Sequence, residues 1–107
     1  MQRTILVLAV GMSAAVNLPA QMTFAKDVAP ILQQRCQACH SAHPTDPGYK
    51  APPKGIAFDT PEEIQRYAPV IYRMAVLTRA MPLGNKTGMK PEERMLIGRW
   101  IAEGARR

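Results

Sequence analysis

The chain has 107 residues, and its 14 lysines and arginines exceed its 8 aspartates and glutamates, which gives a formal net charge of +6. This length allows one small domain, in which side chains alone form only a modest core. The positive charge favours an acidic protein partner or a membrane surface. Nucleic acid is not indicated, because the basic residues are scattered from Lys26 to Arg107 and no nucleic-acid motif is present.

Residues 1–20 have the pattern of a secretory signal peptide. Arg3 supplies a positive charge, and a predominantly apolar stretch follows as far as Val16. Cleavage after Ala20 fits the start of the domain best, and cleavage after Ala15 is the alternative. An uncleaved membrane anchor would need an apolar stretch of roughly 20 residues, which is longer than this one. We therefore expect an exported, periplasmic protein, which is membrane-associated if the segment is not cleaved.

The first predicted helix begins near Asp27, whose carboxylate can cap it, and Pro30 is tolerated in its first turn. Its apolar stripe consists of Phe24, Val28, Ile31 and Leu32. The many prolines and glycines of residues 41–59 predict an irregular loop after this helix.

Two further helical regions follow the loop. Thr60 is a suitable N-cap, with Pro61 at the first helical position and Glu63 completing a capping box. Pro69 should divide this region into a short helix and a second one that ends near Arg79.

The last predicted helix begins at Pro91 and ends at Gly104. Its buried stripe consists of Leu96, Ile97, Trp100 and Ile101. We expect Trp100 to pack against the first helix or against the edge of a bound group. Every predicted element is a helix, so the predicted fold class is all-α.

Cys36-Gln37-Ala38-Cys39-His40 carries the most specific signal in the chain, because Cys-x-x-Cys-His is the attachment signature of c-type haem. Each cysteine would form a thioether bond with one haem vinyl group, and the two residues between them let one helical turn span the vinyls. His40 would then stand at the haem face, where its imidazole can ligate iron.

Three alternative roles of the two cysteines fit the sequence less well. A redox dithiol is expected in a βαβ context, which is not visible here. A structural zinc site needs four ligands, and His43 is the only further histidine or cysteine. A disulfide between Cys36 and Cys39 would close too small a loop to add much stability.

A ligand for the opposite face of the iron is predicted at Met81, where Met81-Pro82 follows a helix. The proline fixes the loop, and the flexible methionine side chain can reach inward. Met89 is the rival because it also lies in a loop, whereas Met74 and Met95 lie in predicted helices and are expected in the core. His43 is a second ligand, a proton-linked group near a haem propionate, or an ordinary loop histidine.

The order of an apolar helix, Cys-x-x-Cys-His, a proline-rich loop, further helices, Met-Pro and a terminal amphipathic helix resembles class I cytochrome c over residues 23–105. The resemblance implies a cytochrome c domain at residues 21–107, wrapped around one covalently attached haem c. Cys36 and Cys39 would hold the haem, and His40 and Met81 would be its axial iron ligands.

A narrower resemblance rests on four segments. They are Pro44-Thr45, Ala51-Pro52-Pro53-Lys54-Gly55, Asp59-Thr60-Pro61 and the stretch from Ala80 to Met89. They are similar to the C-terminal cytochrome c domain of bacterial membrane-bound urate hydroxylases, here detached from the membrane portion. This resemblance implies a membrane oxidase as electron donor and a terminal oxidase as acceptor, but carries over no residue for urate chemistry.

We therefore expect a monomeric electron-transfer protein that carries single electrons between redox partner proteins and is not itself an enzyme. The alternative is a haem-based enzyme or sensor in which the sixth iron position is open. A third possibility is a structural or binding module with a fortuitous, empty motif, but loss of the haem would leave such a chain with a thin core.

Overall fold

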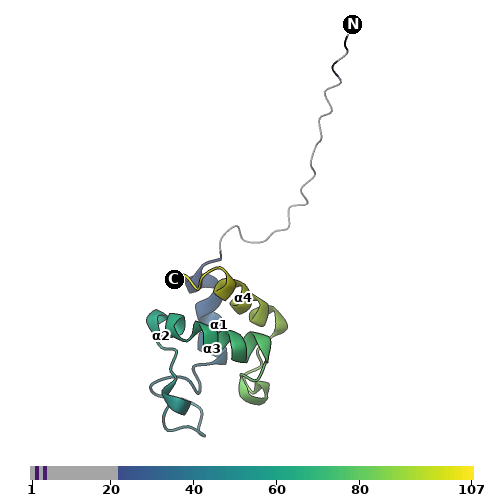
Figure 1. The fold of residues 1–107 in the computed structure, drawn as a ribbon. Coiled ribbons are helices and arrows are strands. Elements are labelled where there is room, and N and C mark those ends of the chain that lie inside the picture. The colour runs from purple at the N-terminus through teal and green to yellow at the C-terminus, as the bar shows by residue number, and fades with distance from the viewer. Residues whose placement is uncertain (1, 3, 5–21) are drawn as a thin grey trace.

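The computed structural model describes residues 2, 4 and 22–107, so the predicted signal peptide lies almost entirely outside the described residues. Figure 1 shows that the described part is built from short helices, and it contains no β-strand. The all-α prediction is therefore confirmed. The elements in order are the π-helical turn η1 (Phe24–Val28), α1 (Ala29–Arg35), the 3₁₀ turn η2 (Pro53–Gly55), α2 (Pro61–Arg66), α3 (Ala68–Ile71), the π-helical segment η3 (Tyr72–Leu77), the 3₁₀ turn η4 (Leu83–Asn85) and α4 (Pro91–Ala102).

The first helical segment begins one turn earlier than the sequence suggested. The Thr23 hydroxyl accepts a hydrogen bond from the Lys26 N–H at 3.2 Å, and Asp27 Oδ2 accepts one from the Thr23 N–H at 2.8 Å. The predicted start at Asp27 is therefore wrong, because its carboxylate reaches back to the cap from inside the turn. Pro30 lies in the first turn of α1, which follows directly on the π-helical turn η1.

The start of α2 and the break after it agree with the prediction. Thr60 Oγ1 accepts the Glu63 N–H, and Glu63 Oε1 accepts the Thr60 N–H, each at 3.1 Å. Helix α2 ends at Arg66, and α3 begins at Ala68 with Pro69 in its first turn. The helical region then continues through η3 to Leu77.

Helix α4 also begins where predicted, although Lys90 is a poor capping residue. Glu93 Oε1 accepts the Lys90 N–H at 2.8 Å, so the carboxylate satisfies a backbone donor ahead of the first turn. The helix ends before Gly104, whose φ of +106° is strained for any other residue type.

The core forms where α4 packs against η1 and η3. The Phe24 and Trp100 rings are 5.4 Å apart, and Trp100 Nε1 donates to the Arg106 carbonyl at 2.7 Å. The predicted contact of Trp100 with the first helical segment is thus confirmed. Met95 is 72 % exposed, and its predicted place in the core is wrong. The buried apolar residues are Val28, Ile31, Leu32, Ala57, Phe58, Ile64, Ala68, Ile71, Ala75, Met89, Ile97, Trp100 and Ala105.

Two loops leave the helices on the same side of the molecule. In Figure 1 the segment between α1 and α2 and the segment between η3 and α4 both extend away from the C-terminus. Lys86 and Asp46 form an ion pair that joins the two loops. Within residues 22–107, no helix combines the length and the apolar character that a membrane span requires.

Close packing of α4 on η3 predicts the effect of Gly98→Val. A Cβ atom at Gly98 would lie 3.0 Å from Cγ1 of Val76, so a larger side chain forces the two segments apart. Such overpacking should lower the free energy of unfolding by about 1–3 kcal/mol, measured by denaturant titration.

Met95→Val is the matched control, because it introduces the same residue on an exposed face of α4. It should change stability by about 0.5 kcal/mol. Equal losses in the two variants would show that the contact between Gly98 and Val76 is not tight.

Candidate functional site

A cavity of about 320 Å³ brings together Cys36, Cys39, His40 and Met81. Three of these residues follow α1 directly, and Met81 comes from the segment that precedes η4. Cofactor-sized sites in proteins span about 300–1,000 Å³ and are mostly apolar. The apolar and aromatic part of the wall consists of Tyr49, Pro53, Ile56, Phe58, Val70, Ile71, Met74, Ala75, Pro82 and Leu83.

The backbone after α1 turns so that both cysteines face this cavity. The Cys36 N–H donates to the Leu32 carbonyl at 3.0 Å and so extends the helix by one residue. The Cys36 carbonyl then accepts the N–H groups of Cys39 at 3.2 Å and of His40 at 2.9 Å. One further turn of chain therefore carries all three side chains into the wall of one cavity.

The imidazole of His40 is held in place by two contacts. Its Nδ1 lies 2.8 Å from the Ile56 carbonyl oxygen, and its ring centroid lies 5.1 Å from that of Phe58. Because a carbonyl can only accept a hydrogen bond, Nδ1 carries the proton. In the neutral imidazole Nε2 then keeps its lone pair, and no group among residues 22–107 forms a hydrogen bond with it. An engaged Nδ1 and a free Nε2 are the usual state of a histidine that ligates a metal.

The two cysteines retain their protons at neutral pH. Burial raises the pKa of the Cys36 thiol to about 12, although the nearby Arg94 charge partly opposes the rise. The pKa of Cys39 is also raised, first by burial and then by the negative charge of Asp46. Reactive dithiols have a lowered pKa, so this environment does not suit thiol–disulfide chemistry. No disulfide joins the two residues.

Neither a separate metal site nor a ligand position for His43 is seen among residues 22–107. Among the described residues, no group of three or more histidine, cysteine, aspartate and glutamate side chains could hold a metal ion. His43 is exposed and is not part of the cavity wall, and its N–H donates to Ser41 Oγ at 3.3 Å.

Met74, Met81 and Met89 lie in two different environments. Met81 lies in the cavity wall, whereas Met89 is buried in the hydrophobic core and is 3 % exposed. Met74, for which the sequence predicts a place in the core, lies in the cavity wall as well, and its carbonyl accepts the Met81 N–H at 2.9 Å. Met74 comes from η3, and helical spacing alone does not distinguish a face toward the cavity from a face toward the core.

A hydrogen-bonded clamp supports the side of the cavity that carries Cys36. Arg35 Nε donates to Glu93 Oε1 at 3.0 Å, and Arg35 Nη1 donates to the Thr87 carbonyl at 2.6 Å. Thr87 Oγ1 donates in return to the Arg35 carbonyl at 2.8 Å. The residue before Cys36 is thereby tied to α4 and to the loop that carries Met81. Sequence patterns give no sign of this clamp, because its partners are more than 50 positions apart in the chain.

Positive charge is concentrated at the same cavity. Its wall includes Arg35, Lys54, Arg73 and Lys86, and no carboxylate, although Arg35 and Lys86 are paired with Glu93 and Asp46 outside the wall. An apolar cavity with cations in its wall suits a largely apolar ligand that also carries negative groups.

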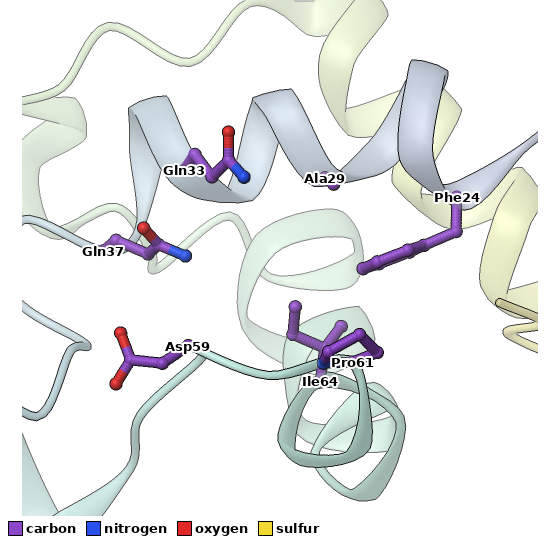
Figure 2. A pocket seen from close by; sticks show the side chains of 7 residues that line it. All are labelled: Phe24, Ala29, Gln33, Gln37, Asp59, Pro61 and Ile64. Carbon is purple, nitrogen blue, oxygen red and sulfur yellow. The ribbon is translucent and has the colours of Figure 1, made fainter.

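A second, smaller pocket has no comparable chemistry. It lies between α1 and the segment 59–64, and Figure 2 shows Phe24 and Ile64 at one end with Gln37 and Asp59 at the other. Gln37 Nε2 donates to the Phe58 carbonyl at 2.9 Å, and Asp59 Oδ2 accepts the Ala42 N–H at 2.8 Å. Gln37 and Asp59 are therefore already engaged within the protein, and the third polar side chain, that of Gln33, is exposed to solvent.

Comparisons with protein-family models, curated proteins and solved structures found no match to this chain.

The clamp predicts a pH-dependent effect of Glu93→Gln. Burial alone would raise the pKa of Glu93, but the hydrogen bonds from the Lys90 N–H and Arg35 outweigh it and hold the pKa below its ordinary value. A lowered carboxyl pKa stabilises the fold above the pKa of the unfolded chain, and this contribution is lost as pH falls through the folded pKa. The variant should lose about 1–3 kcal/mol at pH 7 in urea titrations.

By pH 3 the difference between Glu93→Gln and the parent protein should have shrunk, because the contribution declines as pH falls below the ordinary glutamate pKa of about 4.3 toward the lowered folded pKa of Glu93. Glu92→Gln, an exposed change in the same turn of α4, should have little effect at either pH. A Glu93→Gln deficit that stays constant between pH 7 and pH 3 would contradict the assigned role of its charge.

Proposed function

We propose that this protein is a mono-haem c-type cytochrome that carries single electrons between redox partners. One observation supports the proposal above all: the two cysteines, the histidine and the methionine singled out in the sequence all lie in the wall of one apolar cavity. Cys36 and Cys39 would hold the haem through thioether bonds, and His40 and Met81 would ligate its iron. The fold would then be a small class I cytochrome c fold around one haem.

The side chains fit this group chemically. A thioether forms when a thiol adds across a vinyl double bond, and the environment of Cys36 and Cys39 favours the protonated thiol. His40 offers Nε2 because Nδ1 is occupied by the Ile56 carbonyl. Lys54 and Arg73 can balance the two haem carboxylates, whereas Arg35 and Lys86 are already paired with Glu93 and Asp46.

The bound haem would supply a one-electron iron couple, and the chain determines how that couple is used. Methionine opposite histidine raises the reduction potential. With both axial positions filled, no position is open for a substrate, which favours an electron carrier over an enzyme. Residues of the apolar wall would limit the contact of a bound haem with water, which would also help to set the potential.

The proposed partners are redox proteins with acidic docking faces. A formal net charge of +6 would speed their encounter, and the on-rate should fall as salt concentration rises. The resemblance to the urate hydroxylase domain suggests a membrane oxidase as donor and a terminal oxidase as acceptor. We place the protein in the periplasm, because c-type haem is attached outside the bacterial cytoplasm.

Met81→Ala tests the assignment of the sixth ligand. In protein exported from cells with haem-attachment machinery, the variant should lose the weak near-infrared methionine–iron band and bind carbon monoxide readily. Its reduction potential should fall by on the order of 100 mV, because axial ligands set this quantity. Absorption spectroscopy and a redox titration measure these effects.

Met74→Ala and Met89→Ala are the controls, and both should keep the near-infrared band. If Met74→Ala loses the band and Met81→Ala keeps it, the ligand is the other methionine of the cavity wall. His40→Ala should lose the low-spin haem spectrum or fail to retain haem. A normal spectrum in that variant would overturn the assignment of His40.

A further inference from the structure

We propose that Arg94 is a positioning residue that holds the backbone of Met81 so that its thioether stays in the cavity. This inference rests on the proposed function, since it concerns the sixth ligand of the haem iron. Arg94 lies in the first turns of α4 and is half-buried. It touches the chain that carries the ligand and is not itself in the cavity wall.

The guanidinium of Arg94 bridges three segments. Its Nη1 donates to the Ala75 carbonyl at 2.6 Å and to the Met81 carbonyl at 2.8 Å. Its Nη2 lies 3.4 Å from Asn85 Oδ1, at the long end of hydrogen-bond range. One side chain therefore links α4 to η3 and to both sides of the turn that follows Met81.

Asn85 extends this network to the far end of the loop. Its Oδ1 accepts the Met89 N–H at 2.9 Å, and its Nδ2 donates to the Met89 carbonyl at 3.2 Å. The Met81 N–H donates to the Met74 carbonyl at 2.9 Å. Both backbone polar groups of Met81 are thus engaged, and the loop from Met81 to Met89 is tied down at its two ends.

Fixing the backbone matters because a methionine side chain does not fix itself. It has three rotatable bonds and adapts to several positions. A ligand from a loop binds iron tightly only if the loop already favours the bound conformation. Loss of a hydrogen bond to a charged group should increase the population in which the thioether is displaced by about 10- to 100-fold.

The geometry requires arginine and not only a positive charge. A planar guanidinium can donate to two carbonyls and an amide oxygen together, whereas a lysine ammonium is a point charge on a flexible stem. Arg94→Lys therefore keeps the charge and removes the bridge. Arg94→Gln removes both, so the two variants together separate position from electrostatics.

The test uses imidazole as a competitor for the sixth iron position in the haem-loaded protein. Arg94→Gln and Arg94→Lys should each bind imidazole about 10- to 100-fold more tightly than the parent, with loss of the near-infrared methionine band on binding. Arg99→Gln is the matched control, because it removes a charge from the same helix and, among residues 22–107, the Arg99 side chain pairs with Glu103 and not with the Met81 loop. Its imidazole affinity should equal that of the parent.

Unchanged imidazole affinity in Arg94→Lys would overturn the inference, as would an effect confined to Arg94→Gln, since the charge alone would then be responsible. If Arg94→Gln does not fold, as judged by far-ultraviolet circular dichroism, Arg94→Lys carries the test. Met81→Ala distinguishes the two proposals. If it binds imidazole no more tightly than the parent, Met81 is not the ligand and the proposed function fails first.

Discussion

The imidazole of His40 is fixed by the hydrogen bond from Nδ1 to the Ile56 carbonyl, and this contact joins the end of the first helix to the long loop before α2. The return hydrogen bond from the Phe58 N–H to the His40 carbonyl, at 2.9 Å, makes the junction double. The loop thereby becomes a wall of the cavity, although the 3₁₀ turn η2 is its only regular element between α1 and α2. The position of this wall, the orientation of Nε2 and the shape of the site all depend on the same pair of hydrogen bonds.

Helix α4 fixes the segments that carry Cys36 and Met81. It contributes no residue to the cavity wall, yet its side chains hold two of the segments that do. Glu93 binds Arg35, next to the first cysteine, and Arg94 binds the carbonyl of Met81. The two residues are adjacent in the chain, so a shift of α4 would displace the proposed haem attachment and the proposed sixth ligand together. The terminal helix thus determines how far apart the two sides of the cavity lie.

Local signals predicted much of the fold and the positions of its boundaries. Pro69 and Pro91 and the capping box at Thr60 act within one helical turn, so their effects can be deduced from neighbouring residues. The Cys-x-x-Cys-His segment is equally local, and its three side chains do lie in one cavity wall. Contacts between distant residues could not be predicted. The roles of Arg35 and Arg94 depend on carbonyls elsewhere in the chain, and the place of Met74 depends on which face of η3 meets α4. The helix start at Asp27 was wrongly predicted because a carboxylate can cap a helix either from the cap position or from inside the first turn.

The cavity is proposed to hold a covalently attached haem. Intact-mass spectrometry under denaturing conditions tests this proposal most directly, on protein exported from cells that have haem-attachment machinery. We predict the mass of the processed chain plus one haem, with neither Cys36 nor Cys39 open to alkylation by iodoacetamide. A chain without added mass, in which both cysteines are alkylated, would show that no haem is covalently attached.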